Sequence, residues 1–262
     1  MNIPNAKKSR LFPLPFSREV VVLLGFILSL TPIVPIVGSA DGRVNQQRLG
    51  DWSGEIGGEF TRRYIQNDLV YFRRGAVLMG RRMSDHLHIW GEGGLTSIQL
   101  LTDGQPLGAW GPSFYLGWAF SYPQPWVKGV EILISARAGF NQSKLAHDKY
   151  SGLVLVSRRS RYEWWEGWGI IGAQGRIWGS ELRGGLVLRK LLVDEFRSLR
   201  SGAALPQKTL YSYDSGFQPG VGVGFDYPLG SGWELSLWGD AFAGPSGRLV
   251  IGVRQWSSPG GW

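Results

Sequence analysis

The chain has 262 residues, no cysteine and a formal net charge of +8. Without disulfides, an exported protein must be held by packing or by a closed hydrogen-bond ladder. The charge excess is mild, and no basic block exceeds the run 158–161, so the composition does not indicate a nucleic-acid partner. The 39 glycines and 13 tryptophans suit a membrane barrel, where glycine eases curvature and tryptophan favours the lipid–water boundary.

The first forty residues read as an export signal. Basic residues at its start precede an apolar stretch from Val20 to Val37, and the small residues Gly38, Ser39 and Ala40 follow. This order predicts a secretory signal cleaved after Ala40; an uncleaved N-terminal anchor is the alternative. Removing its net charge of +3 leaves about +5 on the mature chain. We therefore expect a signal peptide over 1–40, a polar lead over 41–52 and one barrel domain over 53–262.

Ten segments after residue 52 alternate apolar and polar residues with a period of two, which predicts strands with one apolar face. In the clearest, Phe114, Leu116 and Trp118 alternate with smaller residues. In the second, Val70 and Phe72 are assigned to the apolar face and Arg73 to the polar face, although Arg74 interrupts the apolar one. The predicted strands are 53–65, 69–82, 86–98, 112–122, 127–141, 163–178, 181–193, 219–228, 232–242 and 247–256.

The predicted connections alternate between short and long. Those after the second, fourth, sixth and eighth strands are tight turns, whereas long loops are expected over 99–111, 142–162 and 194–218. Short periplasmic turns and longer extracellular loops are typical of bacterial outer-membrane barrels. The sequence thus predicts an all-β, transmembrane, up-and-down antiparallel barrel of eight to ten strands, located in the cell outer membrane.

The apolar faces must point outward, because several dozen large side chains exceed what a barrel of this size can enclose. A soluble periplasmic barrel with an apolar ligand site is the alternative. Charges turned into a narrow lumen must pair, so we expect an internal ion-pair network. Its predicted members are Glu55, Glu59, Arg73, Glu92, Glu131, Arg137, Glu166, Arg176, Glu181, Arg183, Arg189, Asp226, Glu234, Asp240, Arg248 and Arg254.

Two further sets are assigned to the barrel ends. Aromatic residues beside the short turns predict a girdle at the periplasmic interface. Its members are Tyr122, Trp126, Trp178, Tyr227, Trp233 and Trp256. Arginines of the expected outer loops could bind lipopolysaccharide phosphates, since a guanidinium holds phosphate bidentately; plain solvated loop charge is the alternative. These arginines are Arg158, Arg159, Arg161, Arg197 and Arg200.

Candidate chemistry is sparse. His86 and His88 share a strand face, a spacing that can hold a metal, but lumen lining is the favoured interpretation. His147 and Asp148 could form a base dyad, with Ser143 and Ser151 nearby as nucleophiles. No matching partner set is found, so we expect no catalytic residues, no metal and no cofactor.

The stretches 114–118, 220–227 and 233–237 resemble the small outer-membrane β-barrel superfamily of opacity and OmpA-like proteins. The closing segment 249–256 resembles the C-terminal strand signal read by the barrel-assembly machinery, although Trp262 could serve instead of Trp256. The resemblance implies a barrel in contact with membrane lipid and says little about activity. The favoured function is a non-enzymatic structural or surface-interaction role with loops contacting lipopolysaccharide or an external partner. A narrow solute pore and a rim-sited hydrolase are the alternatives.

Overall fold

Each of the ten alternating segments forms a strand in the computed structural model, and the strands close into one antiparallel barrel. The structure describes residues 52–65, 68–100, 108–127, 129–177, 179–243 and 246–257. The predicted signal peptide and the lead up to Asp51 lie outside these residues, as does Trp262. The described part of the chain holds no helix that is long and apolar enough to cross a membrane.

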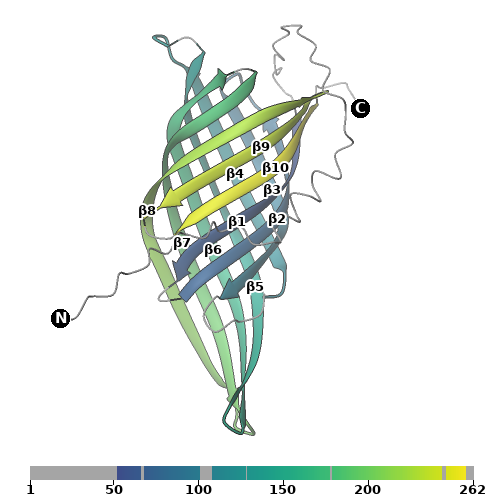
Figure 1. The fold of residues 1–262 in the computed structure, drawn as a ribbon, viewed down its shortest axis with the longest axis vertical. Coiled ribbons are helices and arrows are strands. Elements are labelled where there is room, and N and C mark those ends of the chain that lie inside the picture. The colour runs from purple at the N-terminus through teal and green to yellow at the C-terminus, as the bar shows by residue number, and fades with distance from the viewer. Residues whose placement is uncertain are drawn as a thin grey trace, which may run out of the picture. The chain divides into compact units, whose positions relative to one another are not determined.

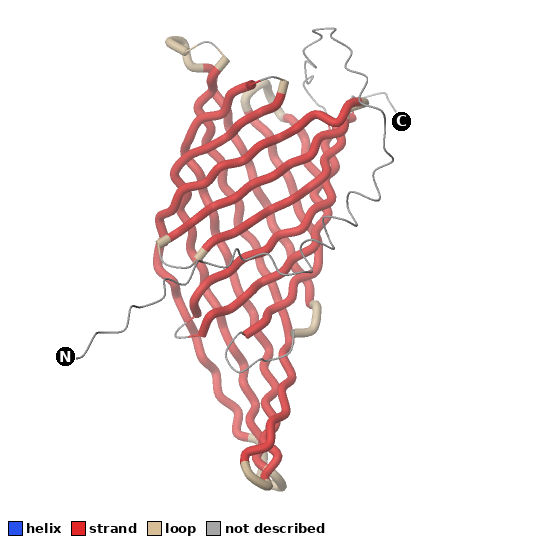
Figure 2. The backbone as a smooth tube through the Cα atoms, viewed as in Figure 1, coloured by secondary structure: helices blue, strands red, loops and turns tan. Residues whose placement is uncertain are grey.

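The strands follow one another around the barrel in chain order, and the last pairs with the first (Figures 1 and 2). Their bounds are β1 Trp52–Ile65, β2 Asp68–Arg82, β3 Leu87–Leu100, β4 Gly111–Pro123, β5 Val130–Ser151, β6 Val154–Ile177, β7 Ser180–Ser201, β8 Gln207–Gly230, β9 Trp233–Phe242 and β10 Gly247–Ser257. Closure of β1 on β10 runs from the pair Trp52 and Ser257 to the pair Arg62 and Gly247. This closure removes the free sheet edges that a bilayer cannot accommodate.

Large aromatic side chains in the lumen face strand positions that have no side chain. A Cβ added to Gly222 or to Gly224 would lie 2.4 Å from an atom of the Trp238 ring. One added to Gly117 would lie 2.5 Å from the Trp90 ring. The alternating glycines of β8 therefore make room for Trp238 inside the barrel.

The largest difference from the sequence prediction concerns two of the expected loops. Residues 142–151 and 154–162 are paired strand in β5 and β6, and residues 194–201 and 207–218 belong to β7 and β8. In Figure 1 these four strands taper to a point well beyond the ends of the other six. The prediction of loops was wrong because polar residues occupy both faces there, so the apolar alternation that marks a membrane strand is lost.

Candidate functional site: a filled lumen and a sheet extension

The outside of the barrel is an apolar band. Leu116, Ile56, Leu186 and Ile171 lie on the outward face and are between 64% and 74% exposed. Side chains this apolar cannot be the water-facing surface of a soluble barrel. A closed antiparallel barrel with an even number of strands and an outward apolar band is the architecture of a bacterial outer-membrane protein.

Charge marks one border of this band. On the outward faces of β1, β2, β5 and β7, counted from the short-turn end, the first charged residues after the apolar run are Arg62, Arg73, Lys144 and Lys190. All four are cations, whereas the corresponding residues of β6 and β8 are Glu163 and Asp214, the second of which lies 3.2 Å from Lys190. Basic residues at this height are where a barrel meets the anionic head groups of lipids.

The centre of the lumen is crossed by buried ion pairs. Arg137 Nη2 lies 2.5 Å from Glu59 Oε2, and its Nη1 lies 3.3 Å from Glu92 Oε1. Arg74 Nη1 lies 2.5 Å from Glu92 Oε2. Both guanidinium groups lie over the Tyr115 ring, at 4.3 and 4.5 Å from its centroid. Five side chains from five consecutive strands thus form one layer, with each charge matched by an opposite one.

A second group of ion pairs continues this layer. The Tyr115 hydroxyl donates to Glu166, and Arg63 Nη2 lies 3.1 Å from the other oxygen of the same carboxylate. On the far wall, Arg248 Nη2 lies 2.6 Å from Asp240 Oδ2 and the guanidinium lies over the Trp168 ring. The network therefore joins strands from all around the barrel, and several of its charged groups face the lumen on the short-turn side.

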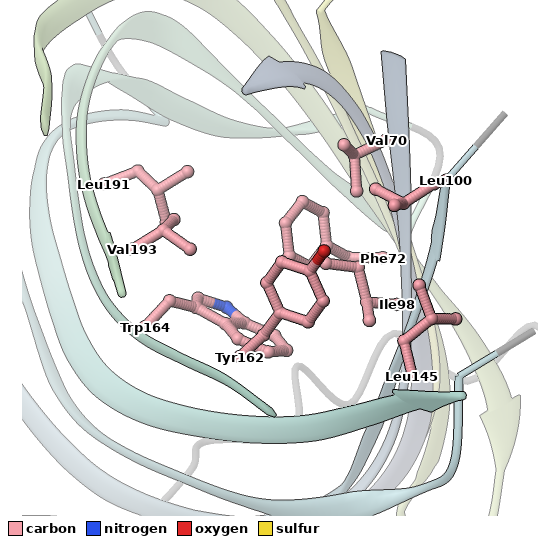
Figure 3. Packing of buried hydrophobic residues seen from close by; sticks show 9 residues of the cluster. All are labelled: Val70, Phe72, Ile98, Leu100, Leu145, Tyr162, Trp164, Leu191 and Val193. Carbon is pink, nitrogen blue, oxygen red and sulfur yellow. The ribbon is translucent and has the colours of Figure 1, made fainter. Parts of the chain in front are cut away.

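An apolar plug fills the lumen between this layer and the far end of the barrel. Phe72 and Trp164, both shown in Figure 3, pack edge to face with centroids 4.9 Å apart. The Arg63 guanidinium lies over the Phe72 ring. Every member is at most 5% exposed. The members are Val70, Phe72, Ile98, Leu100, Leu145, Tyr162, Trp164, Leu191 and Val193. Water and ions have no path through such a cluster.

At the short-turn end the lumen widens into a chamber of about 180 Å³. Its walls carry Trp90, Trp168 and Trp238 beside arginines and glutamates of the network. Arg254 pairs with Glu55 at 2.8 Å on one side of this region. The barrel is thus hollow at one end and closed by two layers of different chemistry beyond it.

One predicted lumen residue lies on the opposite face. Arg73 faces outward, where its Nη2 donates to Gln99, and the neighbouring Arg74 points into the lumen. The prediction for the second strand inverted its two faces, because Val70 and Phe72 resemble lipid-facing residues but belong to the plug. Arg74, which interrupts the supposed apolar face, was the signal that the assignment was wrong.

The other predicted lumen residues share the lumen face of their strands. Arg183 pairs with Asp226 at 2.9 Å, and Gln174 donates to Glu131. Arg189 is 1% exposed and lies over the Phe242 ring, where its hydrogen-bond partner is Gln218. The three remaining predicted lumen residues lie toward the short-turn end; they are Arg176, Glu181 and Glu234. The sequence did not single out Arg63, Tyr115 or Trp164, since polar positions were selected by charge alone.

Beyond the cationic border stands what we call the sheet extension, residues 144–161 of β5 and β6 and 194–214 of β7 and β8. Its centre is Glu195, which accepts hydrogen bonds from Arg197, Arg158 and Ser160. Burial raises the pKa of the Glu195 carboxyl, but these hydrogen bonds outweigh burial and lower the pKa from 4.5 to about 2. The extension therefore has a charged centre of its own.

This extension contains the arginines proposed to bind lipopolysaccharide, and most are already engaged. Arg158 and Arg197 point to the inner face and pair with Glu195. Arg159 makes a two-point contact with Asp148, which lowers the pKa of that carboxyl to about 2. The two remaining residues differ. Arg161 lies 3.1 Å from Glu163 and over the Phe196 ring, whereas Arg200 is exposed at the far tip.

Four of the six residues of the predicted aromatic girdle lie at the short-turn end. Tyr122, Trp126, Tyr227 and Trp233 are exposed at the short-turn end, between 40% and 86%. The described residues do not include Trp178. Trp256 departs from the prediction: it pairs with Ser53 on the lumen face, and its Nε1 donates to Glu234. Its even spacing from Arg248 and Arg254 on β10 puts it inside.

The candidate catalytic residues are not brought together. His147 and Asp148 are neighbours on β5, so their side chains point to opposite faces, and Asp148 is held by Arg159. Ser143 donates to the Ala109 carbonyl, and Ser151 is exposed at the end of β5.

The other two histidines are also separated. The His88 ring lies against the Trp90 and Trp256 rings in the lumen, while the His86 ring lies near Phe120 and Tyr122. Among the described residues, no group of three or more metal-ligating side chains occurs.

Comparison with known proteins adds outer-membrane barrels as structural neighbours. No family model and no curated protein matches the sequence. The translocator domain of the autotransporter NalP from Neisseria meningitidis is 11% identical, with a TM-score of 0.46 over 91% of this chain and 96% of that one. The outer membrane protease OmpT from Escherichia coli is 9% identical, with a TM-score of 0.42 over 79% and 96%. Ail, the attachment invasion locus protein of Yersinia pestis, is 12% identical, with a TM-score of 0.36 over 80% and 100%. Likeness at this level carries no argument about activity.

Proposed function

We propose that this chain is a non-enzymatic outer-membrane barrel with a closed lumen, which serves a structural role in the membrane and presents its sheet extension to a partner outside. One observation carries this proposal: two layers of different chemistry, the ion pairs of Arg74 and Arg137 and the apolar plug around Trp164, fill the barrel in series. A solute that crossed the barrel would have to disrupt both layers.

The same observation speaks against the alternative of a narrow pore. A pore that passes small solutes needs a continuous wet path lined by side chains that can bind and release them. Here the plug residues are almost completely buried, and the arginines and glutamates next to them form ion pairs with one another. The chamber at the short-turn end is therefore a dead end.

The surroundings of the candidate catalytic groups support a non-enzymatic role. A general base must lie within hydrogen-bond reach of its nucleophile, and a third group must orient it. His147 and Asp148 lie on opposite faces of β5, and Asp148 already holds Arg159 in a two-point contact. A rim-sited hydrolase has no assembled dyad to work with among these residues.

We further propose that lipopolysaccharide contacts this barrel at the border of the apolar band rather than at the predicted arginines. Arg62, Lys144 and Lys190 project outward just beyond the apolar residues, which is the height of lipid phosphates. Arg158 and Arg197 point the other way and are neutralised by Glu195. Phosphate contact by the exposed Lys144 needs no ion pair to be broken first.

The test is conductance of the full chain in a planar bilayer. The folded barrel, verified by its shift in gel mobility on heating, is expected to give no current steps above the background of the bilayer. An open porin reconstituted in the same way is the positive control. Reproducible single-channel steps from the folded protein would refute the closed lumen and with it the proposed function.

A further inference from the structure

The sheet extension has a feature that the barrel lacks, an open edge. Above Gly220, β8 has β7 on one side only, because the pairing with β9 begins at the pair Gly220 and Phe242. Residues 207–219 of β8 thus have one free edge. It is regular over 207–214, where every second N–H and C=O points away from the sheet, and irregular at Ser215 and Gly216. The side chains from Gln207 to Ser212 are all exposed, so no other described part of the chain covers them.

Proteins normally protect such an edge with charges, prolines or bulges. Over 207–214 this edge carries only two charged residues, Lys208 and Asp214, and no proline, while its irregularity and Pro219 lie closer to the barrel. Leu210, Tyr211 and Tyr213 give it a high preference for strand structure. An edge that is long, exposed and rich in β-formers is a template for an added strand.

We infer that β8 of the sheet extension binds an extended peptide segment of an external partner by strand addition, and that this segment carries small aliphatic residues on one face and acidic residues on the other. This inference rests on the proposed surface-interaction role and names the class of its partner. Two features beside the edge argue for that chemistry, one on each face.

On the inner face, a small hollow with a volume of about 30 Å³ lies beside the edge strand. Tyr211 and Tyr213 of β8 line it together with Val70 and Leu100 of the plug, and its charged lining residues, Glu195 and Arg197, are paired with each other. A strand added to β8 would direct alternate side chains toward this hollow. Its size suits one small aliphatic side chain and excludes an aromatic one.

On the outer face, two cations lack a carboxylate partner among the described residues. Lys208 lies opposite Ser198 in the ladder between β7 and β8, and Arg200 is two residues further along β7 on the same face. Both side chains are exposed. Acidic side chains on the outer face of an added strand would meet both cations, which favours the acidic composition.

A second copy of the chain is disfavoured as the occupant. Copies in one membrane share one orientation, so two β8 strands would meet running in the same direction. The antiparallel alternative is the free part of β5, whose pairing with β4 ends at Asn141, apart from one bridge between Ala109 and Lys144. Beyond that bridge, the free part of β5 spans residues 145–151 and is shorter than the β8 edge.

The probe is a blocked octapeptide that alternates valine with aspartate, titrated against the full chain in lipid nanodiscs by calorimetry. Amide hydrogen exchange locates the contact. We expect saturable binding and slower exchange across 207–214. The same peptide with N-methyl groups on every second backbone nitrogen should not bind, since it cannot extend the ladder. Equal binding of the methylated peptide, no binding, or protection confined to another segment would overturn the inference.

Charge-reversal variants of the chain test whether the bound segment must be acidic. The double substitution Arg200→Glu with Lys208→Glu should weaken binding of the aspartate peptide about tenfold, whereas Arg81→Glu, at an exposed arginine near the short-turn end, should leave its affinity unchanged. An equal loss for both proteins would overturn the acidic component. Appearance of dimers on native mass spectra that depend on the β8 edge would make a second copy the occupant instead. If the barrel does not conduct and does not bind the peptide, this inference alone is refuted. If the barrel conducts, the proposed function is refuted.

Discussion

The sheet extension continues four of the ten strands of the barrel, yet the two regions are stabilised in opposite ways. Within the apolar band, closure of β1 on β10 satisfies the backbone, lipid covers the outside, and ion pairs fill the inside. In the extension, both faces are polar and two strand edges are open. The comparison shows that a β-sheet that starts inside the bilayer can continue into water when each strand pairs with a neighbouring strand. It does not need a continuous apolar face there.

The largest effect is expected from a substitution in the lumen. Arg137→Met would leave the buried carboxylates of Glu59 and Glu92 with one cation fewer, at a cost of about 3–5 kcal/mol to the free energy of unfolding. Urea unfolding of the reconstituted barrel measures this. Arg81→Met, an exposed arginine near the turn end, is the matched control and should cost less than about 1 kcal/mol. A small effect of Arg137→Met would mean that water reaches the network.

A smaller and more local effect is expected at Glu195. Because its pKa is lowered in the folded state, its contribution to stability is full above about pH 4.5 and is lost as the pH falls toward about 2. The full contribution is about 3 kcal/mol, since one pKa unit corresponds to about 1.4 kcal/mol. Amide exchange in the extension should therefore accelerate over this pH range.

Glu195→Gln separates this carboxylate from the others. The variant should show faster exchange in the extension already at pH 7 and a weaker dependence on pH below 4.5. Exchange within β1 and β2 should be the same in both proteins, because Glu195 lies outside the closed barrel. An unchanged pH profile would show that some other group controls the opening of the extension.

The smallest effect is expected at the border between the two regions. Lys144→Glu replaces an exposed cation at lipid-phosphate height and should lower the amount of lipopolysaccharide that copurifies with the barrel about two- to fivefold. Native mass spectrometry of the detergent extract measures this, with Arg81→Met as the control at the opposite end. Equal lipid retention would remove Lys144 from the proposed contact.

The sequence by itself determined the strands of the closed barrel, because a lipid-facing side and a lumen-facing side impose a period of two on every strand that crosses a bilayer. This pattern placed β4, with Leu116 outside and Tyr115 inside, and most of the lumen charges. It failed for β2, where Val70 and Phe72 are apolar yet internal. The hydrophobicity of a side chain shows that it avoids water. It does not show whether the side chain contacts lipid or the interior of the protein.

Tertiary structure alone decided what closes the lumen and what becomes of the long polar segments. The plug forms because residues far apart in sequence, such as Phe72 and Trp164, meet across the barrel. The segments 142–162 and 194–218 are strands because each finds a hydrogen-bonding neighbour, a property of strand pairing that no local pattern records. The open edge of β8 follows from the same cause, since β9 ends where the barrel does.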